Sequence, residues 1–211
     1  MEDVVLASRY VRLEPLEHRH CEGLEAAARG DDHLYDWSPV PKDKAEAARY
    51  IETALSWKQA CTAVPFAIVR LNDEVVIGST RLWNLERWMW PEGHPSHGRL
   101  DPDACEIGYT WLAPSAIRTG ANTEAKLLLL THAFETWRVL RVCLHADVRN
   151  KRSCVAIERI GATFEGILRA HRMAKDCTPR DSARYSIIAA EWPAVKRHLT
   201  RYFPDPNAAT C

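Results

Sequence analysis

The stretch WLAPSAIRTGANTEAKLLLLTHAFETW, residues 111–137, contains the features that decide the fold. It starts at the end of an apolar strand, EIGYTWL, turns through small residues and becomes a long apolar helix. At a helix N-terminus, free backbone N–H groups and the positive end of the helix dipole favour an anion. We therefore predict a phosphate-binding turn over residues 118–123.

The composition limits the classes of protein that this chain can be. Its 211 residues fit one domain, which we place at residues 1–203, followed by a tail at 204–211 that we expect to be disordered. Lys and Arg total 28, as do Asp and Glu, so no basic field points to nucleic acid. No signal peptide and no apolar run of membrane-spanning length is present, so no membrane association is expected.

The cysteines indicate a compartment. Seven Cys without C-x-x-C spacing argue against a disulfide framework and against a zinc site. We therefore expect no metal and a reducing cytoplasm as the location.

Hydrophobic periodicity predicts an α+β domain around one sheet. Alternating patterns indicate strands at residues 9–15, 65–71, 75–83, 105–112, 141–146, 163–172 and 184–190. Apolar residues at helical spacing indicate helices at residues 16–29, 42–58, 122–137, 151–160 and 192–202.

Several motifs in the second half of the chain carry a family resemblance. They are the strand EIGYTWL, the helix segment AKLLLLTHAFE, the strand RVCLHADVRN, NKRS at residues 150–153, ERIGA at 158–162 and EG at 165–166. Together they resemble the GNAT acyltransferase superfamily, and more closely its Rim-type branch, which includes N-terminal acetyltransferases of ribosomal proteins. The resemblance extends over residues 9–199. It implies a single mixed, mostly antiparallel sheet of about seven strands flanked by helices, with a V-shaped splay between the two central parallel strands.

One motif departs from the family pattern. The pyrophosphate motif of the family is Gln/Arg-x-x-Gly-x-Gly/Ala, and here only Gly120 matches it. Ile117 occupies the first position and Asn122 the last, while Arg118 stands next to the missing basic residue and could compensate for it.

The resemblance implies an acyl-CoA-dependent N-acyltransferase, most readily one that moves acetyl from acetyl-CoA to a primary amine by direct attack in a ternary complex. Two acceptor classes stay open: a protein or peptide N-terminus, and a small amine such as a metabolite or antibiotic. The residues expected at the CoA co-substrate are Trp111, Leu112, Arg118, Thr119, Gly120, Ala121, Asn122, Thr123, Asn150 and Ser153. The competing hypothesis is a CoA-binding sensor or interaction protein without catalysis.

Proton transfer has two candidates. The resemblance places Ser153 near the thiol, and Glu106 could act as base through a water. The structural alternatives are a helix cap formed by Asn150 and Ser153, and an ion pair for Glu106. Where the Rim branch has an acidic residue, this chain has Arg172, and the neighbouring His171 could substitute for it.

Aromatic residues mark the expected acceptor side. The candidates are Tyr35, Trp37, Trp83, Trp88 and Trp90, the last two in a long irregular loop at residues 84–104. Aromatic and Met residues are also enriched at protein interfaces, so the loop is an equally good candidate for a homodimer contact or a cover over the sheet.

Overall fold

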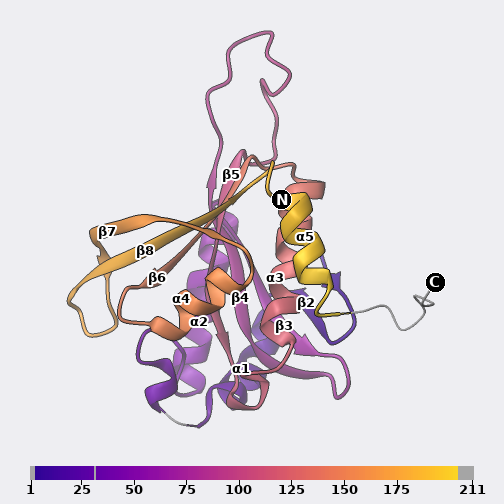
Figure 1. Cartoon of the computed structure of the whole chain (residues 1–211). Coiled ribbons are helices and arrows are strands. Elements are labelled where there is room, and N and C mark those ends of the chain that lie inside the picture. The colour runs from indigo at the N-terminus through magenta and orange to yellow at the C-terminus, as the bar shows by residue number, and fades with distance from the viewer. Residues whose placement is uncertain (1–2, 31, 204–211) are drawn as a thin grey trace.

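The computed structural model describes residues 3–30 and 32–203, and these form a mixed sheet flanked by helices (Figure 1). The predicted disordered tail at 204–211 lies outside the described residues. The strand order is β1-β2-β3-β4-β5-β6-β8-β7, with β5 and β6 parallel and the other neighbours antiparallel. This confirms the predicted α+β class.

The strands are β1 (Leu6–Ala7), β2 (Val11–Pro15), β3 (Ala63–Arg70), β4 (Val75–Glu86), β5 (Ala104–Leu112), β6 (Arg141–Asp147), β7 (Thr163–Met173) and β8 (Pro179–Ile188). The α-helices are α1 (Cys21–Ala28), α2 (Lys44–Gln59), α3 (Ala121–Thr131), α4 (Lys151–Arg159) and α5 (Trp192–Thr200). Short helical turns are η1 (His18–His20), η2 (Asp32–Tyr35), η3 (Pro114–Ala116) and η4 (His132–Thr136).

The centre of the sheet is buried on both faces. Seven of the eight residues of β3 are buried, which explains its unbroken apolar run. Side chains of a strand alternate between faces, and neighbouring residues of β4 show it. Arg81 contacts α2, whereas the hydroxyl of Thr80 joins a hydrogen-bond chain to Lys126 of α3. Helices α2 and α3 therefore cover opposite faces.

Several elements differ from the predicted ranges, among them the following three. Strand β1 is an eighth strand of two residues, too short to show an alternating pattern. Strand β8 begins at Pro179 because the preceding turn is tight and takes Cys177 to a left-handed φ of 60°. The central helix ends at Thr131 and continues as a π-helical turn, η4.

A buried carboxylate ties the N-terminal segment to α3. Glu124 accepts hydrogen bonds from the backbone amides of Arg9, Tyr10 and Val11 at 2.9, 2.8 and 2.8 Å. A carboxylate that accepts several N–H bonds is well compensated for its burial. Glu124 therefore fixes the start of α3 against the edge of the sheet.

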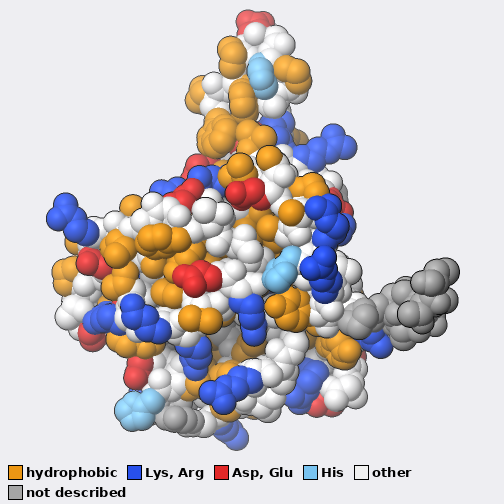
Figure 2. Space-filling view, in the orientation of Figure 1, with side chains coloured by type: hydrophobic (Ala, Val, Ile, Leu, Met, Phe, Trp, Pro, Cys, Tyr) orange, Lys and Arg blue, Asp and Glu red, His pale blue; other side chains and the backbone are white. Residues whose placement is uncertain are grey.

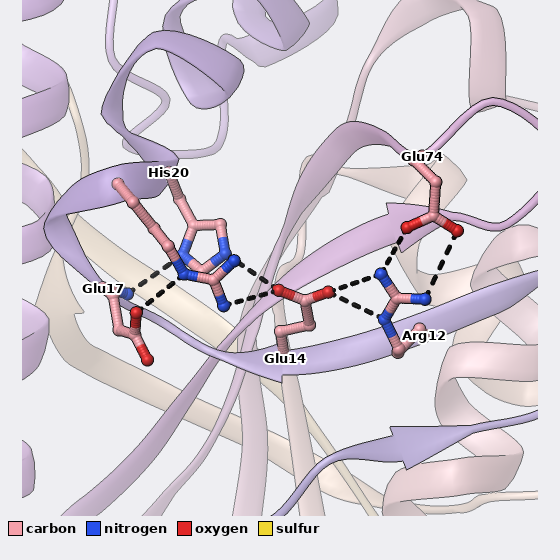
Figure 3. Close-up of polar contacts among 6 residues, drawn as sticks. Arg12, Glu14, Glu17, His20 and Glu74 are labelled. Atoms are coloured by element: carbon pink, nitrogen blue, oxygen red, sulfur yellow. Dashed lines mark hydrogen bonds and ion pairs between the residues drawn. The ribbon is translucent and has the colours of Figure 1, made fainter.

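A second charged cluster closes the corner between β2 and η1 (Figure 3). Glu14 accepts from Arg12 Nε at 2.7 Å and from Arg19 Nη2 at 2.8 Å, and its Oε2 lies 3.2 Å from His20 Nε2. Arg12 also reaches Glu74 of the β3–β4 turn. Every member has a charged or polar partner, so the role of this cluster is structural.

Candidate active site

The two parallel strands separate in the middle of the sheet. Strands β5 and β6 pair only from Ala104 to Glu106, against Arg141 to Cys143. Beyond that point β5 continues to Leu112 and β6 to Asp147, and the described residues show no further pairing between them. The predicted V-shaped splay is therefore present. Its unpaired strand edges can hydrogen-bond an extended ligand as an added strand would.

A β-bulge shapes the β5 side of the splay. Ser79 pairs with Trp111 and Arg81 with Gly108, so Tyr109 and Thr110 lie opposite the single residue Thr80. Tyr109 has a left-handed φ of 52°. Gly108, Tyr109 and Thr110 are half-exposed, although the rest of β5 is buried. The bulge therefore leaves this part of β5, next to the gap, less buried than the rest of the strand.

The predicted phosphate turn leads from β5 to α3. Arg118 takes a left-handed φ of 61°, and the Thr119 hydroxyl accepts from Ala121 N at 3.2 Å. The first helical bond runs from Glu124 N to Gly120 O, so the amides of Asn122 and Thr123 precede it. Arg118 and Thr119 are exposed, whereas Ala121 and Thr123 are buried. The amides that precede the first helical bond make this turn a candidate anion site.

Gly120 lies beside the end of the chain after α5. Its φ is −68°, which any residue adopts, and an added Cβ would lie 3.1 Å from Phe203. The absence of a side chain there therefore leaves room for Phe203. The expectation that Gly120 lies at the CoA co-substrate stays a prediction.

Asn150 and Ser153 lie together at the start of α4. Asn150 is the N-cap, and its side chain accepts from Ser153 N at 3.0 Å. The structural alternative for this pair, a helix cap, is therefore present. The cap uses the backbone N–H of Ser153, so its half-exposed hydroxyl is available for a second role. Helix α4 directly follows β6, as α3 follows β5, so both helix N-termini lie beyond the open end of the splay (Figure 1).

Glu106 lies at the point where the strands separate, and it is 2 % exposed. Arg172 donates to both of its oxygens, at 3.2 and 2.9 Å, and His145 Nδ1 lies 3.0 Å from Oε1. Burial opposes ionisation, but the contacts with His145 and Arg172 outweigh it and lower the pKa of Glu106. A carboxylate held in this way is a weak base by itself and a strong partner for an imidazole.

His145 is a site residue that the sequence did not reveal. It lies on β6 two residues past the last pair with β5, and its Nε2 has no hydrogen-bond partner among the described residues. His171 lies beside it, with ring centroids 4.9 Å apart. Burial and the nearby Arg172 lower the pKa of His171. The Glu106–His145 pair thus lies where the two strands stop pairing, with one imidazole nitrogen unpartnered among the described residues.

An aromatic box lies next to this cluster on the α2 face. The guanidinium of Arg81 lies 4.5 Å from the ring centre of Tyr50, 5.0 Å from that of Trp57 and 4.5 Å from that of Tyr109. Trp83 stacks on Trp57 at 6.0 Å and contacts Tyr109 edge-on at 5.0 Å. Arg172 lies 4.4 Å from the ring centre of Trp83. The box and the Glu106 cluster therefore meet at one wall, which Trp83 and Arg172 form.

Two of the predicted acceptor residues lie at the open end of the splay. Tyr35 is buried and donates to Leu112 O at 3.0 Å, and its ring contacts Trp111 edge-on. Trp37 is half-exposed, with Arg149 4.5 Å from its ring centre. Since Tyr35 and Trp111 pack on each other, their rings belong to the core. Trp37, by contrast, is partly exposed and packs on a charged side chain instead of on the core.

The predicted acceptor residues Trp88 and Trp90 are not among the residues of the aromatic box. They belong to an arm, residues 87–103, that projects from the sheet between β4 and β5 (Figure 1). Asp103 orders the arm by accepting from Trp88 N at 2.7 Å and from Trp90 Nε1 at 2.9 Å. Hydrophobic side chains gather on the arm (Figure 2), including the fully exposed Met89. The structure thus separates these two residues from Trp83.

Some of the site residues had a signal in the sequence. Tyr50 and Trp57 are seven residues apart, and therefore lie on one helix face. Arg81 is a charged residue inside the apolar strand VVIGSTRLW. The grouping of His145 with Glu106 had no such signal, because it depends on how far apart the strands lie.

No cluster of metal-binding side chains occurs within residues 3–30 and 32–203. In the same residues no helix is long and apolar enough to cross a membrane.

Comparison with known proteins agrees with this geometry. Residues 11–163 match the family model described as Acetyltransferase (GNAT) domain. The chain is 36 % identical over 192 residues, 90 % of its length, to a Bacillus subtilis (strain 168) protein named "Putative ribosomal N-acetyltransferase YdaF", of which it covers 97 %.

Solved structures show the same fold. A GCN5-related N-acetyltransferase from Brucella melitensis superposes with a TM-score of 0.81 at 29 % identity, over 98 % of this chain and 88 % of that one. Mycobacterium smegmatis RimJ, solved in complex with CoA-disulfide, gives a TM-score of 0.74 at 20 % identity, over 95 % and 93 % of the two chains. The splayed parallel strands, the two helix N-termini beyond them and the matched family model lead to one conclusion: this chain is an N-acetyltransferase of the GNAT family, which uses acetyl-CoA.

Proposed function

We propose that the chain transfers acetyl from acetyl-CoA to a primary amine by direct attack in a ternary complex. The observation that carries this is the splay of β5 and β6 beyond Glu106 and Cys143. A thioester lying in that gap would have strand edges on both sides and the bulge at Tyr109 beside its carbonyl. The residues present fit the co-substrate, since one helix N-terminus follows each strand.

The CoA arm would lie along the β5 edge near Trp111 and Leu112. Its pyrophosphate would lie against the amides of residues 118–123, where Arg118 and Thr119 are exposed and Asn122 and Thr123 precede the first helical bond. Asn150 and Ser153 would meet the arm from the β6 side. In this arrangement a backbone N–H at the end of β5 polarises the carbonyl and stabilises the oxyanion.

The proton of the attacking amine goes to the Glu106–His145 pair. His145 Nε2 is unpartnered among the described residues and accepts the proton, while Glu106 at 3.0 Å from Nδ1 stabilises the imidazolium. Glu106 thus acts through His145, which modifies the simpler expectation of Glu106 as the base. Ser153 is the candidate that meets the leaving thiolate.

Two acceptor classes follow from the comparisons and the site. The name of the B. subtilis relative supports a peptide N-terminus, and the enclosed aromatic wall at Trp83 supports a small amine. Seven cysteines without disulfide or metal spacing fit a reducing cytoplasm as the place of action. The exposed Trp88 and Met89 of the arm are candidates for contact with a second copy.

The test is turnover with acetyl-CoA across a panel of peptide and small primary amines, following thiol release and the acetylated product by mass spectrometry. We expect intersecting initial-velocity patterns, because a ternary complex forms without an acetyl-enzyme. Parallel lines with an isolable acetyl-enzyme would contradict direct attack. Tight CoA binding with no thiol release on any amine would favour a non-catalytic CoA-binding protein.

In a companion test, Ser153→Ala should lower kcat more than it weakens CoA binding. Unchanged turnover in this variant would leave Ser153 only its place in the helix cap. His145→Gln should lower kcat more than it weakens CoA binding. Gln is a matched replacement because it keeps a polar side chain of similar size without a basic ring nitrogen.

A further inference from the structure

Arg81 is a buried cation without an anion. It is 1 % exposed, its Nε and Nη1 have no hydrogen-bond partner, and no carboxylate lies within ion-pair distance among the described residues. Burying an unpaired charge is costly, and a guanidinium cannot lose its proton to escape that cost. The three surrounding rings offset part of it through cation–π contacts.

The surroundings add more positive charge than they cancel. Glu106, the carboxylate of the neighbouring cluster, is already bound by Arg172 and His145. Arg180 lies on the same side, where burial and then the nearby Arg172 lower its pKa. Burial raises the pKa of the Tyr109 phenol, and Arg81 and Arg172 oppose that rise. The wall between the splay and the box therefore has a surplus of cations.

The box also adjoins the gap in which transfer would occur. Arg81 pairs across the ladder with Gly108 at the start of the bulge, and Gly108 has no side chain to separate the two. The ring of Tyr109 packs on the guanidinium and on the ring of Trp83, and both residues are half-buried. A ligand that displaces either ring reaches the free N–H groups of the guanidinium.

We propose that the acceptor is an amine that also carries an oxyanion, a carboxylate or a phosphate, and that Arg81 binds this group within the box formed by Tyr50, Trp57, Trp83 and Tyr109. This rests on the proposed function for the amine half of the acceptor. The anion half rests only on the unpaired guanidinium. Bidentate N–H bonds to a carboxylate or phosphate are the geometry that arginine favours.

The first test uses the wild-type protein and matched amines that differ only in the anion. The pairs are β-alanine with β-alaninamide, 4-aminobutyrate with its amide, Ala-Glu with Ala-Gln, and O-phosphoethanolamine with ethanolamine. We expect kcat/KM to be about tenfold to a hundredfold higher for the anionic member, the range for one hydrogen-bonded charged group. The phosphate pair and the carboxylate pairs separate the two oxyanions. Equal kcat/KM within each pair would overturn the proposal and leave the acetyltransferase reaction standing.

The second test uses Arg81→Met, which keeps the volume and removes the charge. The preference for anionic amines should vanish, so that kcat/KM for each anionic member falls to that for its neutral partner. Arg70→Met is the control, because Arg70 pairs with Asp73 at the surface of the β3–β4 turn and should keep the preference. If Arg81→Met does not fold, Arg81→Lys replaces it and is expected to keep part of the preference. A full preference in Arg81→Met would overturn the proposal.

A binding readout separates this proposal from the proposed reaction. With CoA present, N-acetyl-β-alanine should raise the melting temperature of the wild type and not that of Arg81→Met, while its amide should raise neither. If no amine is acetylated but the acid still binds through Arg81, the reaction fails and the anion site stands. If the acid binds both proteins equally or neither, the anion site is refuted.

Discussion

The two faces of strands β4 and β5 each bury a cation without a carboxylate within ion-pair distance among the described residues, and they treat it differently. On the α2 face, Arg81 lies among aromatic rings. On the α3 face, Lys126 donates to the Thr110 hydroxyl at 2.6 Å, and Thr110 is 2.8 Å from the hydroxyl of Thr80. Burial lowers the pKa of Lys126 to about 7.

The two cations differ in whether groups of the chain itself can accommodate them. Lysine can give up its proton, so Lys126 can be buried as an amine that hydrogen-bonds a hydroxyl. Arginine keeps its charge, so Arg81 retains its need for an anion. The α3 face therefore accommodates its cation with groups of the chain itself, whereas on the α2 face two nitrogens of Arg81 have no hydrogen-bond partner among the described residues.

The largest effect is expected for Glu106→Gln, which breaks the charged cluster beside the box. Arg172 and His145 would lose their carboxylate, and the free energy of unfolding should fall by about 3 kcal/mol, the low end for a broken buried pair because Arg172 is partly exposed. Urea denaturation measures this change.

The matched control is Glu165→Gln, since Glu165 also pairs with two arginines, Arg141 and Arg184, but is about a third exposed. Its loss should cost less than about 1 kcal/mol. Equal losses in the two variants would mean that the Glu106 cluster is no more enclosed than a surface pair.

The next effect concerns the α3 face and its pH dependence. The pKa of Lys126 falls from 10.5 unfolded to about 7 folded, so between these values the unfolded chain binds one more proton. The free energy of unfolding should therefore rise with pH, by up to about 1.4 kcal/mol per pH unit. Below pH 7 the destabilisation caused by burying Lys126 should be at its maximum. Between pH 7 and pH 9, the free energy of unfolding of the wild type should therefore rise relative to that of Lys126→Met.

Lys196→Met serves as the control, because Lys196 pairs with Glu135 at the surface of α5. The pH dependence of its stability should match that of the wild type. A wild-type curve parallel to that of Lys126→Met would show that Lys126 is charged in the folded protein, and the two faces would then resemble each other.

Gly108→Ala should have an intermediate effect, on the α2 face. An added Cβ would lie 2.4 Å from Trp83 Nε1, so the indole must move away from Trp57 and Arg172. We expect a loss of about 1–3 kcal/mol and a higher KM for the amine, with little change in CoA affinity. Trp83→Phe in the same chain should restore most of the stability, and no restoration would place the clash elsewhere.

The smallest effect is expected for Thr110→Val, which removes the hydroxyl that accepts from Lys126. The cost should be about 1 kcal/mol, measured by thermal unfolding. Thr53→Val, at an exposed position of α2, should stay within about 0.5 kcal/mol of the wild type. A loss at Thr110 no larger than at Thr53 would indicate that Lys126 needs no hydroxyl partner.

The helices and most strands could be predicted because their patterns are local. The strand at residues 105–112 and the helix after it were found from period and turn residues, and β5 and α3 lie there. Strand β1 was missed, because two residues carry no pattern and pair only by contact with β2. Of the proposed acceptor residues, Trp83 lies in the wall of the site and Trp88 does not, although only five positions separate them in the sequence.

By itself the sequence determined the fold class and the positions of the turns at residues 118–123 and 150–153, which follow from hydrophobic period, capping residues and motif spacing that act over a few residues. The splayed pair of strands was expected only from the family resemblance. Only the tertiary structure decided that Glu106 meets His145 and Arg172, and that Arg81 has rings instead of an anion around it. The reason is that burial and charge pairing depend on which strands lie side by side and how far apart they stand, and no local pattern records that.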